Sequence, residues 1–94
     1  MQALNKRICV KFEGRVQGVG FRYTVISLSS SYEVTGYVLN DYDGSVELVA
    51  EGDEKKLNKF LGAILNSGLR RYIVSHDVNW FEAKNEFKGF GIKY

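Results

Sequence analysis

The residues best suited to chemistry lie in one short stretch, GRVQGVGFR at residues 14–22. Its first seven positions hold three glycines and no acidic side chain, between a strand-like run and a helix-like run. A glycine-rich loop before a helix exposes backbone N–H groups at the positive end of the helix dipole, where an oxyanion binds favourably. Arg22 adds a permanent cation whose fork of donors matches phosphate or carboxylate. The stretch therefore predicts an anion-binding site.

A second interpretation of this stretch is a tight strand-to-helix turn, in which the glycines supply positive φ angles and Arg22 lies on the surface. Two well-known phosphate motifs do not match it. The dinucleotide-binding pattern requires a third glycine at the position of Tyr23. The Gly-Lys-Ser/Thr triplet of nucleoside triphosphate loops is absent from the sequence. The loop thus suits a small anion better than a nucleotide.

Two elements must hold this loop in place. Residues 7–13 alternate between apolar and polar side chains, which predicts a half-buried strand with Cys9 on its polar face. After the loop, apolar residues recur at steps of four, three and four, which predicts the apolar face of a helix: Phe21, Val25, Leu28 and Tyr32.

The rest of the chain predicts three more strands and a second helix. A strand over residues 34–40 is followed by a hairpin turn and a strand over residues 45–51. Gly52 and Asp53 then open a helix with Gly68 at its C′ position, and the buried stripe of that helix is Leu57, Phe60, Leu61, Ile64 and Leu65.

The C-terminal part predicts a fourth strand over residues 72–83, of undetermined register, and a short last strand within residues 87–94, at an edge of the sheet. The order β-α-β-β-α-β, with this short fifth strand, predicts an α+β fold. We expect a ferredoxin-like split β-α-β sandwich, in which an antiparallel sheet carries two helices on one face.

Composition limits the possible classes of protein. We expect one domain over residues 1–94, because a chain of this length can build a single core. The net charge of +2 does not indicate nucleic acid or a membrane as a partner. Cys9 is the one cysteine, so an intramolecular disulfide is impossible and we expect a reducing, cytoplasmic location. Residues 1–7 are polar, and we expect no secretion signal there.

Four segments, taken together, resemble the acylphosphatase family. They are GRVQGVGFR at 14–22, TGYVLN at 35–40, DGSVE at 43–47 and GFGIKY at 89–94. The segments follow in the right order over almost the whole chain, and the nine-residue loop is highly specific, whereas the C-terminal run is weakly so. The resemblance implies the ferredoxin-like fold and the hydrolysis of acyl phosphates to a carboxylate and inorganic phosphate.

The resemblance also implies roles for particular residues. Arg22 and Asn40 match the catalytic residues of the family: Arg22 binds the phosphate, and Asn40 holds the attacking water. The backbone amides that match the phosphate cradle belong to Arg15, Val16, Gln17, Gly18, Val19 and Gly20. No metal or cofactor is expected, inorganic phosphate should inhibit competitively as the product, and we expect a monomer.

Physical chemistry agrees with this division of roles. Phosphoryl transfer needs positioning and neutralisation of charge, which amides and an arginine supply. Asn40 does not titrate near neutral pH, but its amide can orient a water, as glutamine does in GTPases. In a split β-α-β fold the second strand runs parallel to the first, so its end should lie beside the loop. The alternative for Asn40 is a turn asparagine before the hairpin.

The chain departs from the family pattern at several positions. Glu33 stands where these proteins usually have a glycine, so we expect a strained or differently capped helix end there. Arg70 and Arg71 replace a proline-containing segment and could form a second basic patch. His76 falls at an apolar position and is predicted to be structural. A nucleophilic Cys9 would need His76 as its partner and is disfavoured.

Two other classes of function remain open from the sequence. RNA-recognition motifs share this architecture, and residues 88–94 resemble their aromatic strand signature. That signature belongs on the third of four strands, however, whereas here it ends the sequence. A non-catalytic anion-binding or regulatory module is the second alternative, because the same module also occurs fused to larger enzymes.

Overall fold

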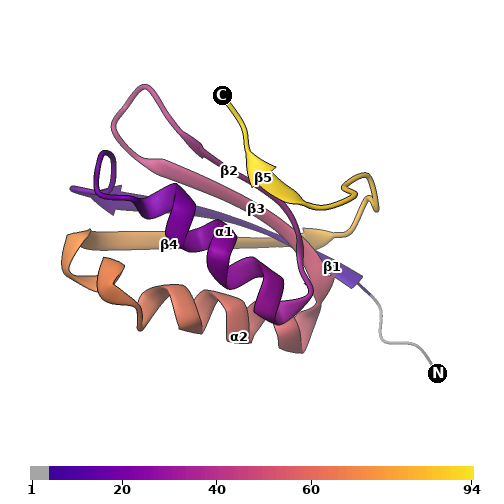
Figure 1. Ribbon diagram of the computed structural model, residues 1–94. Helices are drawn as coiled ribbons and strands as arrows, with labels where there is room; N and C mark the ends of the chain where they lie inside the picture. The colour runs from indigo at the N-terminus through magenta and orange to yellow at the C-terminus, as the bar shows by residue number, and fades with distance from the viewer. Residues whose placement is uncertain (1–4) are drawn as a thin grey trace.

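A computed structural model shows two helices lying on one face of a five-stranded sheet (Figure 1). It describes residues 5–94. Most of residues 1–7, where we expect no secretion signal, therefore lies outside the described residues. The elements are β1 Asn5–Gly14, α1 Phe21–Tyr32, β2 Thr35–Asn40, β3 Val46–Asp53, α2 Glu54–Leu65, the 3₁₀ helix Gly68–Tyr72, β4 Ile73–Glu82 and β5 Phe90–Ile92. The predicted order of strands and helices is confirmed.

The strand order across the sheet is β4-β1-β3-β2-β5. β1 pairs antiparallel with β3 and β4, and β2 pairs antiparallel with β3, as predicted. The short strand β5 pairs parallel with β2 at the edge, so the sheet is mixed rather than wholly antiparallel. β1 and β2 run in the same direction with β3 between them, and their C-terminal ends therefore lie at the same end of the sheet.

The core lies between the sheet and the two helices. Ile8, Val10 and Phe12 of β1 are fully buried in it, whereas Cys9 is half-buried on the opposite face, as the alternation predicts. The register of β4, which the sequence left undetermined, pairs Phe12 of β1 with His76 of β4. The His76 side chain is exposed, but its ring stacks 6.4 Å from that of Phe12, centroid to centroid, so it packs at the margin of the core.

The connection between β4 and β5 packs against part of the sheet face opposite the helices. The carboxylate of Glu51 is 3% exposed and accepts hydrogen bonds from the N–H groups of Lys84 and Asn85 at 2.8 and 3.0 Å. Arg7 donates from Nε to Glu51 at 2.7 Å and from Nη2 to Glu86 at 2.7 Å. This ionic network fixes the path of the chain to β5.

The ends of the helices differ from the predictions at one point. Glu33 ends α1 in the left-handed region, with φ 54° and ψ 43°, which confirms the strained end expected there. Asp53 caps α2 by accepting from the N–H of Lys55 at 2.8 Å. Gly68 is not the C′ glycine of α2, and that prediction was wrong. Asn66 closes the helix at a negative φ, and Gly68 begins the next 3₁₀ helix.

The 3₁₀ helix carries two exposed arginines. Arg70 and Arg71 lie on the surface of the 3₁₀ helix, and the Arg71 guanidinium stands 5.7 Å from the ring centroid of Tyr72. Within residues 5–94, neither helix has the length and the apolar character needed to cross a membrane.

Candidate active site

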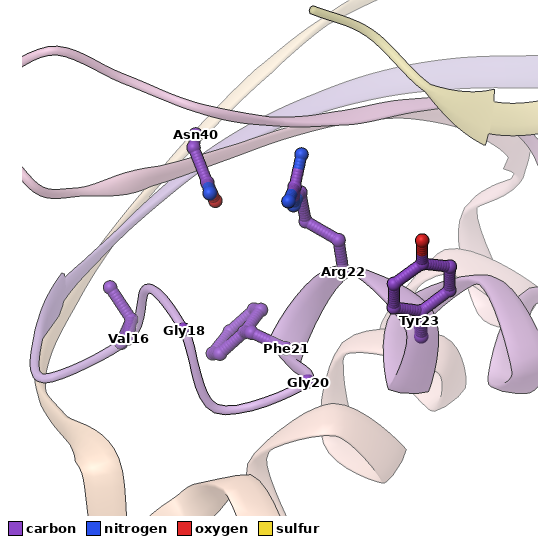
Figure 2. A pocket seen from close by; sticks show the side chains of 7 residues that line it. All are labelled: Val16, Gly18, Gly20, Phe21, Arg22, Tyr23 and Asn40. Carbon is purple, nitrogen blue, oxygen red and sulfur yellow. The ribbon is translucent and has the colours of Figure 1, made fainter.

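A small cavity of about 160 Å³ lies between the 14–22 loop and the end of β2. Figure 2 shows the loop along one side of it, Asn40 on the other side, and Arg22 rising from the start of α1 between them. The residues that line the cavity are Val16, Gly18, Gly20, Phe21, Arg22, Tyr23 and Asn40. Arg22 and Asn40, predicted to meet, therefore do share one cavity.

The loop is anchored where it leaves β1. Gly14 has a φ of 135°, and a Cβ atom there would lie 2.3 Å from the carbonyl oxygen of Tyr72. This close approach lets the N–H of Arg15 donate to the same oxygen at 3.0 Å. The Arg15 N–H is therefore already engaged and its side chain is exposed, so the predicted amide cradle narrows to residues 16–20. The next residue, Val16, is fully buried, and this burial fixes the position of the loop there.

The loop is also fastened to the turn that follows Asn40. Gln17 donates from Nε2 to the carbonyl oxygen of Asp41 at 2.7 Å and to that of Ser45 at 2.9 Å. The turn itself is held by the carboxylate of Asp43, which accepts from the Ser45 N–H at 2.9 Å. These contacts, invisible in the sequence pattern, set the distance between the loop and the end of β2.

Asp41 and Asp43 belong to the hairpin turn that the sequence predicts between residues 40 and 45. Asp41 Oδ1 accepts from the N–H of Tyr42 at 2.8 Å, and Asp43 forms a 2.7 Å ion pair with Lys11. The ammonium group of Lys11, together with the hydrogen bonds from Ser45, holds the pKa of the Asp43 carboxyl well below its usual range. Within residues 5–94, the carboxylates of Asp41 and Asp43 form no ion pair with Arg22, so its guanidinium is left open to a ligand.

The loop beside the cavity carries backbone donors without backbone partners. Within the described residues, the N–H groups of residues 16–20 donate to no backbone carbonyl, and the first α-helical bond runs from Thr24 N–H to Gly20 O at 3.0 Å. Gly20 holds the N-cap position of α1 at φ 77°, without a side-chain cap, and the first turn has no acidic residue. The amides and the helix dipole together give this end of the cavity a positive potential.

Asn40 carries an unusual polar atom. Its Oδ1 is buried, yet it has no hydrogen-bond partner within residues 5–94. An unpaired buried carbonyl oxygen costs about 1–3 kcal/mol, so such an atom in a folded protein calls for an explanation. In Figure 2 the Asn40 amide points from β2 into the cavity, toward the loop and Arg22. An acceptor in this position is suited to a small ligand or a water.

Arg22 is half-buried and forms no ion pair with the part of the chain that the structure describes. Its guanidinium carbon lies 5.7 Å from the ring centroid of Tyr94. The site therefore combines a cation free to bind an anion, a row of amide donors and an unpaired acceptor. Such a set of groups has the chemistry needed to bind an oxyanion and to hold one further polar molecule beside it.

Other candidates for chemistry lie elsewhere. Cys9 is half-buried on the face of the sheet away from the helices, and burial raises the pKa of its thiol. His76 lies on the opposite face, so the two do not form a nucleophile–base pair. Among residues 5–94 no group of three or more His, Cys, Asp or Glu side chains is placed to hold a metal ion.

Comparisons with known proteins identify the family of the chain. The family model described as acylphosphatase matches residues 8–92. An acylphosphatase of Caldanaerobacter subterraneus subsp. tengcongensis is 42% identical over 95% of this chain and 99% of its own length. The crystal structure of Bacillus subtilis acylphosphatase superposes with a TM-score of 0.87 at 34% identity, covering 95% of this chain and 99% of that one.

A longer protein contains a similar unit. Full-length HypF, in its phosphate- and nucleotide-bound form, matches the whole of this chain with a TM-score of 0.90 and 28% identity, but only 12% of its own length is covered. The family model spans nearly all of the chain, and the relative from Caldanaerobacter is similar over almost its full length. The chain therefore belongs to the acylphosphatase family.

Proposed function

We propose that this acylphosphatase hydrolyses acyl phosphates in the cavity between the 14–22 loop and β2, with Arg22 and Asn40 as its catalytic residues. The observation that carries the proposal is the buried, unpartnered Oδ1 of Asn40 across one small cavity from an arginine without an ion pair. The products are a carboxylate and inorganic phosphate.

Binding of the phosphoryl group falls to the loop. The N–H groups of residues 16–20 and the guanidinium of Arg22 donate to its non-bridging oxygens, where negative charge is concentrated in the transition state. Because these donors are fixed by Gly14, Arg15 and Gln17 before substrate arrives, little reorganisation is needed during the reaction.

Asn40 positions the nucleophile. A water donates one O–H to Asn40 Oδ1, which leaves a lone pair of the water oxygen directed at phosphorus. The new P–O bond forms as the bond between phosphorus and the acyl oxygen breaks, and the electron pair of that bond leaves with the carboxylate. The water proton passes to a phosphoryl oxygen, so the side chain of Asn40 stays neutral throughout. A carboxylate is a good leaving group, so no strong general acid is required.

The proposal also covers the inhibitor, the cellular location and the oligomeric state of the enzyme. Inorganic phosphate is expected to compete with substrate for the loop, and no cofactor takes part in the proposed steps. A single free cysteine, Cys9, suits a reducing compartment, which favours a cytoplasmic location. We expect the enzyme to act as a monomer, because every group in the proposed mechanism comes from one chain.

Two other functions have weaker support. The second candidate is a non-catalytic anion-binding module. It is supported by the similar unit within HypF, because the crystal structure of HypF is of a phosphate-bound form. RNA binding is less favoured. Phe90, the central aromatic residue of the signature, is half-buried and packs edge-on against Phe60 of α2, with centroids 5.7 Å apart, instead of facing outward from the open side of the sheet.

Steady-state hydrolysis of benzoyl phosphate in EDTA, with inorganic phosphate titrated as a competitor, tests the proposal. We expect turnover that is unaffected by EDTA and inhibited competitively by phosphate. A folded protein that binds phosphate without turnover would instead support the anion-binding module.

A further inference from the structure

Two cavities meet at the proposed catalytic residues. The second, of about 360 Å³, shares Arg22 and Asn40 with the first and is otherwise lined by Leu39, Asp41, Tyr42, Lys93 and Tyr94. The three most exposed tyrosines of the described chain lie around this pair of cavities: Tyr23 lines the first, and Tyr42 and Tyr94 line the second. The acyl group of a substrate could therefore lie beside Tyr23 in the first cavity or beside Tyr42 and Tyr94 in the second.

The stereochemistry of phosphoryl transfer distinguishes the two places. In such a displacement the attacking oxygen, phosphorus and the leaving oxygen lie roughly in line. If Asn40 holds the water, the acyl group must leave on the side of the phosphoryl group away from Asn40. The second cavity lies around the end of β2, where Leu39, Asn40, Asp41 and Tyr42 line it in succession, and so it is on the side of the water. An acyl group placed there would not be in line with the attack.

Tyr23 lies away from Asn40, on the far side of Arg22. Figure 2 shows Asn40 and Tyr23 on opposite sides of Arg22, with the Tyr23 ring standing up from the first turn of α1 beside the arginine. The side chain is 68% exposed although it belongs to the lining of the phosphate cavity. An exposed aromatic face at the mouth of a polar cavity gains little from folding but can stack on a planar ligand.

We propose that Tyr23 is the platform for the acyl group, and that the enzyme therefore favours acyl phosphates with an aromatic or other planar apolar acyl group over acetyl phosphate. The inference rests on the proposed function, because it uses the position of the water at Asn40. It adds a residue that determines specificity and does not itself touch the reacting atoms.

The test compares benzoyl phosphate with acetyl phosphate in wild-type protein and in the variants Tyr23→Ala and Tyr23→Phe. Loss of one aromatic contact should raise KM for benzoyl phosphate about 2- to 10-fold. Its kcat should change little, because stacking is equal in the ground state and the transition state. The ratio of kcat/KM for benzoyl to that for acetyl phosphate should fall in Tyr23→Ala and be retained in Tyr23→Phe.

The matched control is Tyr42→Ala, which removes an exposed tyrosine from the second cavity. Its ratio should equal that of the wild type. A fall in the ratio for Tyr42→Ala, with none for Tyr23→Ala, would put the acyl group in the second cavity and overturn the proposal. A parallel loss of inhibition by inorganic phosphate in Tyr23→Ala would also overturn it, because Tyr23 would then shape the phosphate site.

Comparing ratios removes the difference in intrinsic reactivity between the two substrates. Failure of the underlying function is visible separately, since the wild-type protein would then hydrolyse neither substrate.

Discussion

Gln17 donates a 2.7 Å hydrogen bond from its side-chain amide to the carbonyl oxygen of Asp41, the residue that follows Asn40. The same nitrogen also donates to Ser45 O at 2.9 Å. The side chain thus joins the loop that would bind phosphate to the strand end that would hold the water. Its role is to keep the two halves of the site at a constant separation.

Replacing Gln17 should therefore reduce turnover without removing any group that touches substrate. We expect Gln17→Ala to lower kcat for benzoyl phosphate about 10- to 100-fold, because a displacement of about 1 Å in an active site has effects of this size. Gln17→Glu should be at least as damaging, since its carboxylate would face two carbonyl oxygens. Steady-state kinetics and circular dichroism of both variants check this. Wild-type kcat in a folded Gln17→Ala protein would contradict the positioning role.

Arg22→Ala should remove both activity and affinity for phosphate. The guanidinium is the charged donor of the cavity, and loss of one oxyanion contact typically lowers the rate about 10²- to 10³-fold. Competition by inorganic phosphate should weaken in parallel. Arg70→Ala is the matched control, because it removes the same charge from the exposed surface of the 3₁₀ helix. If Arg22→Ala and Arg70→Ala had equal kinetics, the effect would come from the net charge of the protein, and the role of Arg22 in the cavity would be ruled out.

Asn40→Ala should separate catalysis from binding. We expect kcat to fall while the inhibition constant of inorganic phosphate stays nearly constant, because the loop and Arg22 remain. The free energy of unfolding should be unchanged or should rise, since the substitution deletes a buried oxygen without a partner. Chemical denaturation and kinetics on the same preparation provide both readouts. Loss of phosphate binding in this variant would rule out the water-orienting role.

The Glu51 network should make stability depend on pH. Burial alone would raise the pKa of Glu51, but hydrogen bonds from the Lys84 N–H, from Arg7 and from the Asn85 N–H, together with the charge of Arg7, lower it below the usual range of a glutamate. The folded state therefore binds the proton less tightly than the unfolded state. The resulting stabilisation is present above the unfolded pKa and is lost as pH falls through the folded pKa.

Glu51→Gln should accordingly destabilise the protein at pH 7 by about 1–3 kcal/mol, the cost of leaving buried donors poorly paired. The difference between variant and wild type should shrink as pH falls from the ordinary pKa of a glutamate, where the unfolded chain takes up the proton, toward the lower pKa of Glu51 in the folded state. Urea unfolding at pH 7 and at lower pH measures this. Glu82→Gln, an exposed carboxylate on β4, serves as control. A difference independent of pH would argue against the ionic network.

Local patterns in the sequence predicted the elements well, because periodicity is a property of neighbouring residues. The alternation in β1 predicted its buried side chains, and the apolar stripe of α2 predicted the buried Leu57, Phe60 and Ile64 together with two leucines that are only partly buried. The prediction failed at Gly68, where a C′ glycine was expected. The end of a helix depends on the turn that follows it, and here Ser67 starts a new 3₁₀ helix by accepting a hydrogen bond from the Leu69 N–H.

By itself, the sequence determined the order of the elements, the glycine-rich loop and the two residues proposed for catalysis. Only the tertiary structure decided that the Arg15 amide is used by Tyr72, that Gln17 ties the loop to the hairpin turn, and that Tyr23 lies across Arg22 from Asn40. These relationships join segments far apart in the chain. They arise from strand register and from the packing of a helix on a sheet, which no local spacing of residue types specifies.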